Sequence, residues 1–305
     1  MMRRLSWLAL CAIVAGMTGG CGDDDGMTGD DGGTDGGSTN CPDDPEVPNP
    51  AGLMGACCYR QSNADRLDAP EFRLAGLKLT APMSLDSIIV RQLLTDALDF
   101  ERFNWIFRLS ISGSNVDVTT GYGERNGDDT FSFVMGGAPG PGAADRWDPL
   151  TATGTISGET VMTMAIAEPL TVPVFDETGT MLTAEFPLHD LVLTMATMSE
   201  DRSCVGTRSA ARYETDAASL EAFIQLEQAR DTRIVAPPID TSLCMFLAGM
   251  ASDAGNCETA QDTWLVPPDS TCDAAGCSFG GCEPATCNAW QVRAEFAAHS
   301  VEITD

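Results

Sequence analysis

Hydrophobic residues recur at every second position through much of the chain, from about residue 72 onward. The pattern is clearest at 105–112, where Trp105, Phe107 and Leu109 alternate with neighbours that include Arg108 and Ser110, and it returns at 290–298. Side chains two residues apart face the same side of a β-strand. Each run therefore predicts a strand with one buried face.

Further segments of the same character lie before and between these two runs. They cover 72–79, 131–135, 151–156, 161–166, 170–175, 181–188 and 191–198. In the first of them the alternation changes phase around Gly76, which predicts a β-bulge. We expect an α+β, mainly β fold: an antiparallel β-sandwich or barrel-like meander with two or three helices, stapled by disulfides.

Two segments have helical periodicity instead. The first runs from Ser84, the expected N-cap, to about Arg102. Its predicted buried face consists of Leu85, Ile88, Ile89, Leu93 and Ala97. The second runs from Asp216 to about Arg230, and its predicted buried side consists of Leu220, Phe223 and Ile224.

The N-terminus has the order of an export signal. Arg3 and Arg4 precede an apolar run, 5–14, that is too short to span a bilayer, and small residues follow it. The run Thr18-Gly19-Gly20-Cys21 resembles the lipobox of bacterial lipoproteins, although Thr18 stands where an aliphatic residue is commoner. The resemblance implies that residues 1–20 are a signal peptide and that Cys21 carries a lipid. Ordinary cleavage near Ala15 or Gly16, giving a soluble product, is the competing interpretation.

Residues 21–56 are predicted to be a disordered, acidic tether rich in Gly and Asp, because they contain too few apolar residues to fold. Asp23-Asp24-Asp25-Gly26 lacks the alternation of a calcium-binding EF-hand loop. Residues 57–305 are predicted to form a single β-rich domain that includes a Cys-rich loop at 244–287. Gly22, rather than Asp, follows Cys21, so the lipoprotein resemblance implies an outer-membrane location, with the side left open.

Ten cysteines remain after Cys11 and Cys21 are set aside, and an even number suits full pairing in an oxidising compartment. They are Cys41, Cys57, Cys58, Cys204, Cys244, Cys257, Cys272, Cys277, Cys282 and Cys287. The last four are evenly spaced, unlike the paired ligands of a structural zinc site, so disulfides are the favoured interpretation. Their connectivity does not follow from the sequence.

The composition excludes some functions. The chain has 17 Lys and Arg against 45 Asp and Glu, a net charge of −28, which disfavours binding to nucleic acids. The motifs of serine hydrolases, zinc proteases, phosphate-binding loops and dinucleotide-binding folds do not occur in it. The two histidines, His189 and His299, are interpreted as structural or exposed. We therefore predict no catalytic residue, no metal and no cofactor.

Three functions remain open. The first is a non-enzymatic binding or interaction module, held at the cell envelope by its membrane-bound lipid, with an unknown protein or small-molecule partner. The second is a lipid or other apolar-ligand binding protein, with a barrel interior lined by Met162, Met164, Met181, Met195 and Met198. The third is a carboxylate-dependent hydrolase. The tryptophans Trp105, Trp147, Trp264 and Trp290 suit a ligand site, but core packing is their default role.

Overall fold

The computed structural model describes residues 62–99, 101–126, 130–136, 147–175, 182–208, 215–216, 218–236, 239–250 and 257–304. These residues belong to one compact unit. The predicted signal peptide and tether, and with them Cys21, Cys41, Cys57 and Cys58, lie outside the described residues.

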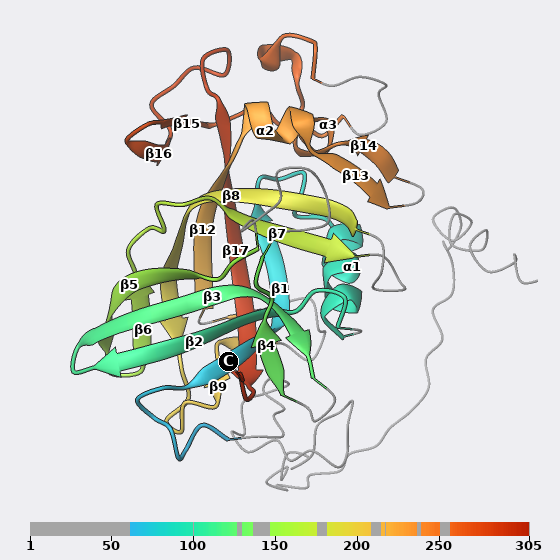
Figure 1. Ribbon diagram of the computed structural model, residues 1–305. Coiled ribbons are helices and arrows are strands. Elements are labelled where there is room, and N and C mark those ends of the chain that lie inside the picture. The colour runs from blue at the N-terminus through green and yellow to red at the C-terminus, as the bar shows by residue number, and fades with distance from the viewer. Residues whose placement is uncertain are drawn as a thin grey trace, which may run out of the picture. The chain divides into compact units, whose positions relative to one another are not determined.

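Within the described residues, eight antiparallel strands form a closed ring (Figure 1). They are β1 (Glu71–Ala81), β2 (Trp105–Ser112), β3 (Asn115–Arg125), β5 (Leu150–Ser157), β6 (Thr160–Thr163), β8 (Leu182–Thr197), β12 (Ala218–Gln225) and β17 (Ala289–Ser300). Their order around the ring is their order in the chain, and β17 closes the ring by pairing with β1, with Phe72 opposite Ser300. The prediction of a mainly β, antiparallel fold is confirmed. Of the two predicted architectures, sandwich and barrel, the structure has the barrel, of the up-and-down type.

Local sequence explains the tight connections of this meander. The β2–β3 and β5–β6 hairpins each turn through two residues that begin with a glycine, Gly113 (φ 62°) and Gly158 (φ 60°). A positive φ costs glycine nothing and suits the twist of a hairpin. The predicted bulge near Gly76 is also present, since the register between β1 and β17 shifts between Leu74 and Gly76.

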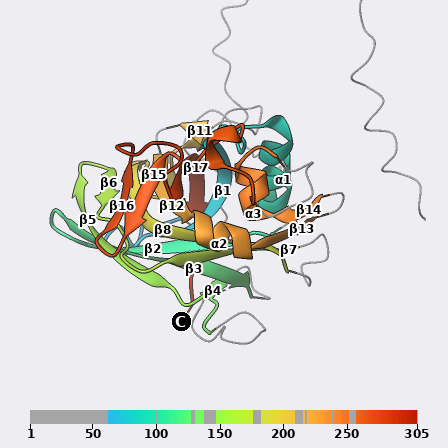
Figure 2. The same cartoon turned by 90° about the horizontal axis from the view of Figure 1, so that it is seen from above.

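The remaining strands do not belong to the ring. They are β4 (Phe131–Phe133), β7 (Leu170–Phe175), β9 (Cys204–Val205), β10 (Thr207–Arg208), β11 (Thr215–Asp216), β13 (Arg233–Ala236), β14 (Ile239–Ser242), β15 (Ser270–Asp273) and β16 (Gly276–Phe279). The helices are α1 (Ile88–Asp99), α2 (Leu226–Asp231) and α3 (Leu243–Leu247), with a 3-10 turn at Gln261–Thr263. Figure 2 shows α1, α3 and the β13–β14 hairpin together on one side of the barrel.

The predicted helix at 216–230 is wrong. Most of it is strand β12, and only its last part, α2, is helical. Leu220, Ala222 and Ile224 are also spaced as on one face of a strand, and β12 pairs along its length with both β8 and β17. Ladder hydrogen bonds on two sides outweigh a local helical preference.

Two other boundaries differ from the prediction. Helix α1 begins at Ile88, where Ser87 Oγ accepts the N–H of Val90, whereas Ser84 Oγ donates to the carbonyl of Leu247. The predicted strands 181–188 and 191–198 form one strand, β8, which bulges at Asp190. The bulge changes which side of β8 faces inward, which is why the sequence reads as two strands.

Candidate functional site

The inside of the barrel contains a cavity of about 230 Å³. All eight strands of the ring contribute to its wall, as do β7, β13, α1 and α3. The lining consists of aliphatic and aromatic side chains and three threonines, and none of the described residues that line it carries a charge. An apolar cavity of this kind, enclosed by an eight-stranded barrel, suits one small ligand.

One row of side chains shows how the wall is built. Leu79 on β1 lies opposite Ala294 on β17, which lies opposite Leu220 on β12, which in turn lies opposite Leu193 on β8. All four line the cavity. The small Ala294 stands between two leucines, and all three leucines are only half-buried although they point into the barrel. In a filled core these positions would be fully buried, so the row faces open space.

Helix α1 covers one side of the cavity. Val90, Leu93, Leu94 and Ala97 line the cavity, at the i, i+3, i+4, i+7 spacing of one helix face. Leu93 and Ala97 also belong to the helix face that the sequence predicts to be buried, whereas Ile88, another residue of that predicted face, is 62% exposed. Leu93 both lines the cavity and is 49% exposed.

Aromatic rings form part of the cavity wall. Phe107 and Phe296 line it and contact each other edge to face, with ring centroids 6.4 Å apart. Phe107 also stacks on the fully buried Phe72, which does not line the cavity. Of the four tryptophans singled out in the sequence, Trp105 lines the cavity, while Trp147, Trp264 and Trp290 are core residues outside its lining.

The predicted methionine lining is wrong. Met162, Met164 and Met195 are between 41% and 65% exposed, and Met198 is buried in the core without lining the cavity. Met181 lies outside the described residues. On β6 the inward position is Val161, which is buried, so its neighbour Met162 faces outward. Leucine, valine and phenylalanine form the wall instead.

A buried ion cluster lies outside the cavity. Glu71, 8% exposed, accepts hydrogen bonds from Arg66 and from the backbone N–H of Ile303, and it pairs with Arg108 at 3.3 Å. These contacts connect β1 and β2 to the C-terminal segment. The cluster stabilises the fold, and none of its residues lines the cavity.

Tyr122 belongs to an aromatic cluster at the end of β3. Its ring lies 5.8 Å from that of Trp147 and 5.6 Å from that of Phe175. Burial raises the pKa of the Tyr122 phenol to about 12, and the negative charge of Glu124 acts in the same direction. The phenol therefore stays neutral throughout the physiological range.

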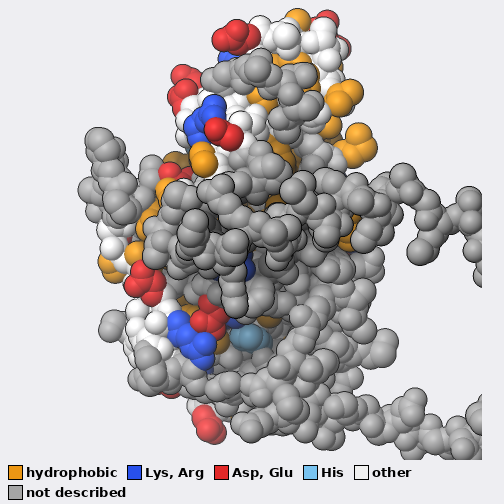
Figure 3. All heavy atoms as spheres, turned by 90° about the vertical axis from the view of Figure 1, so that its right-hand side faces the viewer, with side chains coloured by type: hydrophobic (Ala, Val, Ile, Leu, Met, Phe, Trp, Pro, Cys, Tyr) orange, Lys and Arg blue, Asp and Glu red, His pale blue; other side chains and the backbone are white. Residues whose placement is uncertain are grey.

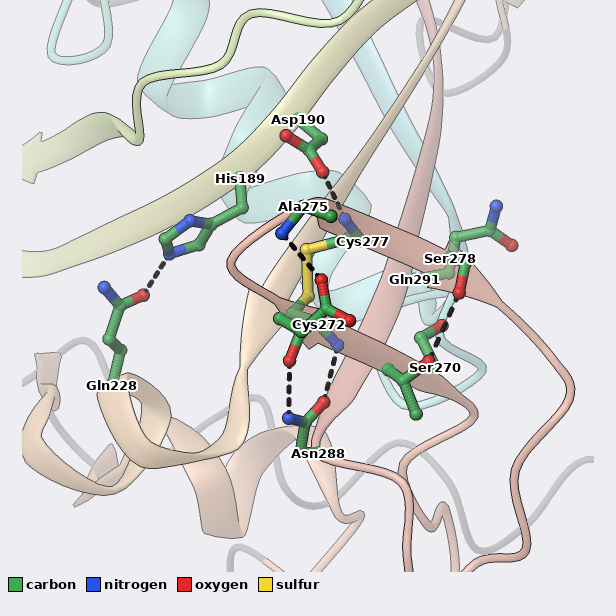
Figure 4. The surroundings of a disulfide bond; sticks show 12 residues. His189, Asp190, Gln228, Ser270, Cys272, Ala275, Cys277, Ser278, Asn288 and Gln291 are labelled. Atoms are coloured by element: carbon green, nitrogen blue, oxygen red, sulfur yellow. Dashed lines mark hydrogen bonds between the residues drawn. A yellow bond between two sulfur atoms is a disulfide. The ribbon is translucent and has the colours of Figure 1, made fainter.

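The neighbouring residues His189 and Asp190 point to different partners (Figure 4). His189 Nε2 lies 2.5 Å from Gln228 Oε1, whereas the carboxylate of Asp190 accepts the N–H of Cys277. Asp190 has a φ of 48° in the β8 bulge, and this turns its side chain toward the β15–β16 hairpin. The two residues form no catalytic pair.

Three disulfides are present among the described residues: Cys244–Cys257, Cys272–Cys277 and Cys282–Cys287. Cys204 is disulfide-bonded as well. The evenly spaced run therefore pairs with its own neighbours, and Cys272–Cys277 bridges β15 and β16 directly. No group of three or more His, Cys, Asp or Glu in the described part of the chain is arranged to hold a metal ion.

Hydrophobic side chains also remain on the surface. Figure 3 shows some of them in the upper part of one face, among acidic and basic side chains. The most exposed are Met83, Met135, Met164, Ile88 and Leu265. None of the helices in the described ranges is long and apolar enough to cross a bilayer.

Comparison with known protein families, with characterised proteins and with solved structures finds no match for this chain.

Proposed function

We propose that this protein is a non-enzymatic binding protein that takes one small apolar molecule into its barrel. The cavity of about 230 Å³ with its hydrocarbon wall is the observation that carries the proposal. Of the three functions that the sequence leaves open, an apolar-ligand binder is the one that uses this space.

The energetic cost of an empty cavity supports this choice. Closed cavities in protein cores cost about 24 cal/mol per Å³, which sets an upper limit of roughly 5 kcal/mol for 230 Å³ of empty space. The net stability of a domain is only about 5–15 kcal/mol. A bound apolar molecule restores the missing contacts and offsets that cost.

A fluorescent dye tests the proposal. N-phenyl-1-naphthylamine is uncharged and apolar, and its emission rises when it leaves water. We expect the full chain, with its disulfides formed, to bind it at one site. Ala152→Phe, which fills the cavity from β5, should weaken binding at least about tenfold, because the added ring occupies the ligand's space.

Thr153→Phe is the matched control, because Thr153 is the next residue on β5 and its side chain is exposed. It should leave dye binding unchanged. Equal binding by Ala152→Phe and Thr153→Phe would show that the dye sits outside the barrel, and the proposal would then be wrong.

We further propose that the protein acts at the cell envelope, held by a lipid on Cys21. The lipobox-like sequence and the cysteine content support this location. Mass spectrometry of the protein from an exporting bacterial host should find an N-terminal acylated Cys21 and no residues 1–20. Cys21→Ser should lose the lipid mass and move from the membrane fraction to the soluble one. An unmodified Cys21 in the wild-type chain would overturn this part.

A further inference from the structure

The cavity contains three hydroxyl groups, and each already has a protein partner. Thr120 Oγ1 accepts the indole N–H of Trp105 at 2.7 Å. Thr163 Oγ1 accepts the backbone N–H of Leu193 at 2.9 Å, and Thr183 Oγ1 donates to the carbonyl of Val174 at 2.8 Å. These bonds hold the hydroxyls to the wall, so the polar atoms of the lining serve the barrel itself.

The two charged residues at the start of β1 also have partners. Arg73 on β1 donates to Asn104 and to the carbonyl of Leu98, and Glu71 pairs with Arg66 and Arg108. None of the charged groups in the described ranges lines the cavity. An ionised group brought inside would lose its water and find no counter-charge, at a cost of several kcal/mol.

From this we infer that the barrel selects uncharged hydrocarbon and excludes any ionised group from its interior. The inference rests on the proposed function and narrows its ligand class. Fatty-acid carboxylates, amines and phosphates bind only if the charged end stays outside. The ligand is therefore a neutral apolar compound, or the far end of a longer acyl chain.

The volume sets the size of the portion that is enclosed. At about 30 Å³ for each water-sized group, 230 Å³ holds roughly eight carbon atoms. We therefore expect affinity to rise with chain length up to about eight carbons and then to level off.

The test compares ligands of one length on the full, disulfide-bonded chain. Octane, 1-octanol, octanoate and octanedioate compete for bound N-phenyl-1-naphthylamine at about pH 8, where both acids are ionised. We expect octane and 1-octanol to displace the dye and octanedioate to bind at least about 100-fold more weakly. The affinity of octanoate should lie between those of 1-octanol and octanedioate.

The outcomes distinguish the proposed function, ligand binding in the barrel, from the inferred exclusion of charged groups. If the dye itself does not bind, the proposed function fails. If the dye binds but octanedioate displaces it as well as 1-octanol does, only the exclusion of charge is overturned. Dodecanol and vesicles of an uncharged phosphatidylcholine distinguish the sources. Phosphatidylcholine that stays with the protein after the vesicles are removed would identify acyl chains as the ligand, whereas displacement of the dye by free alcohols without such retention would identify a small neutral compound.

Discussion

Replacing Ala294 by leucine distinguishes an open cavity from a filled core. The free energy of unfolding should rise if the cavity is open and fall if the core is filled. Ala294 is 2% exposed, lines the cavity, and lies between Leu79 and Leu220 in the sheet. Leucine adds three carbons. At about 0.8 kcal/mol for each buried methylene, Ala294→Leu should raise the free energy of unfolding by up to about 2 kcal/mol. The same carbons occupy ligand space, so dye affinity should fall roughly 30-fold.

Ala297→Leu is the matched control. Ala297 is on the same strand and 1% exposed, but it does not line the cavity. Leucine there has no space to enter, so it should lower the free energy of unfolding by about 1–3 kcal/mol. Guanidinium unfolding with the disulfides intact gives both values, and dye titration gives the affinities. If Ala294→Leu destabilises as much as Ala297→Leu, the barrel interior is full and the reasoning fails.

Two further predictions concern ionisable groups. The raised pKa of Tyr122 means that the unfolded chain loses this phenolic proton near pH 10 and the folded chain near pH 12. Stability should therefore be unaffected below pH 10 and fall by at most about 3 kcal/mol between pH 10 and 12. Tyr122→Phe should remove that part of the fall in denaturation measurements, and an unchanged pH profile would contradict it. Glu71→Ala leaves the guanidinium groups of Arg66 and Arg108 without their carboxylate. It should cost about 3 kcal/mol of stability without changing dye affinity, and a loss below about 0.5 kcal/mol would contradict this.

The strands were predictable where apolar and polar residues alternate. In β2 and β17 the apolar residues alternate with polar ones such as Arg108, Ser110 and Arg293, so the hydrophobic pattern alone places both strands correctly. Strand β12 was not predicted as a strand, because Phe223 on its outer side is also buried, against Cys272 and Ala289. With both faces covered, the apolar residues lose their alternation and resemble a short helix.

The cavity was not predictable from the sequence. Alternation shows which residues point inward, but empty space depends on how side chains from eight strands meet across the barrel. The methionine prediction failed for a related reason. The bulges in β8 change the side on which Met195 lies, and only the pairing with β12 reveals them. Small inward residues among large ones, such as Ala294 beside Phe296, were the one available signal.

The pairing of β1 with β17 has a consequence for how the chain folds. The two partners, with Phe72 opposite Ser300, come from opposite ends of the described sequence. Contacts at such long sequence separation raise the contact order and slow folding. Until the last strand arrives, β1 and β12 both present open edges that can pair with other chains. A protein truncated before residue 289 should therefore aggregate, however well its earlier hairpins form.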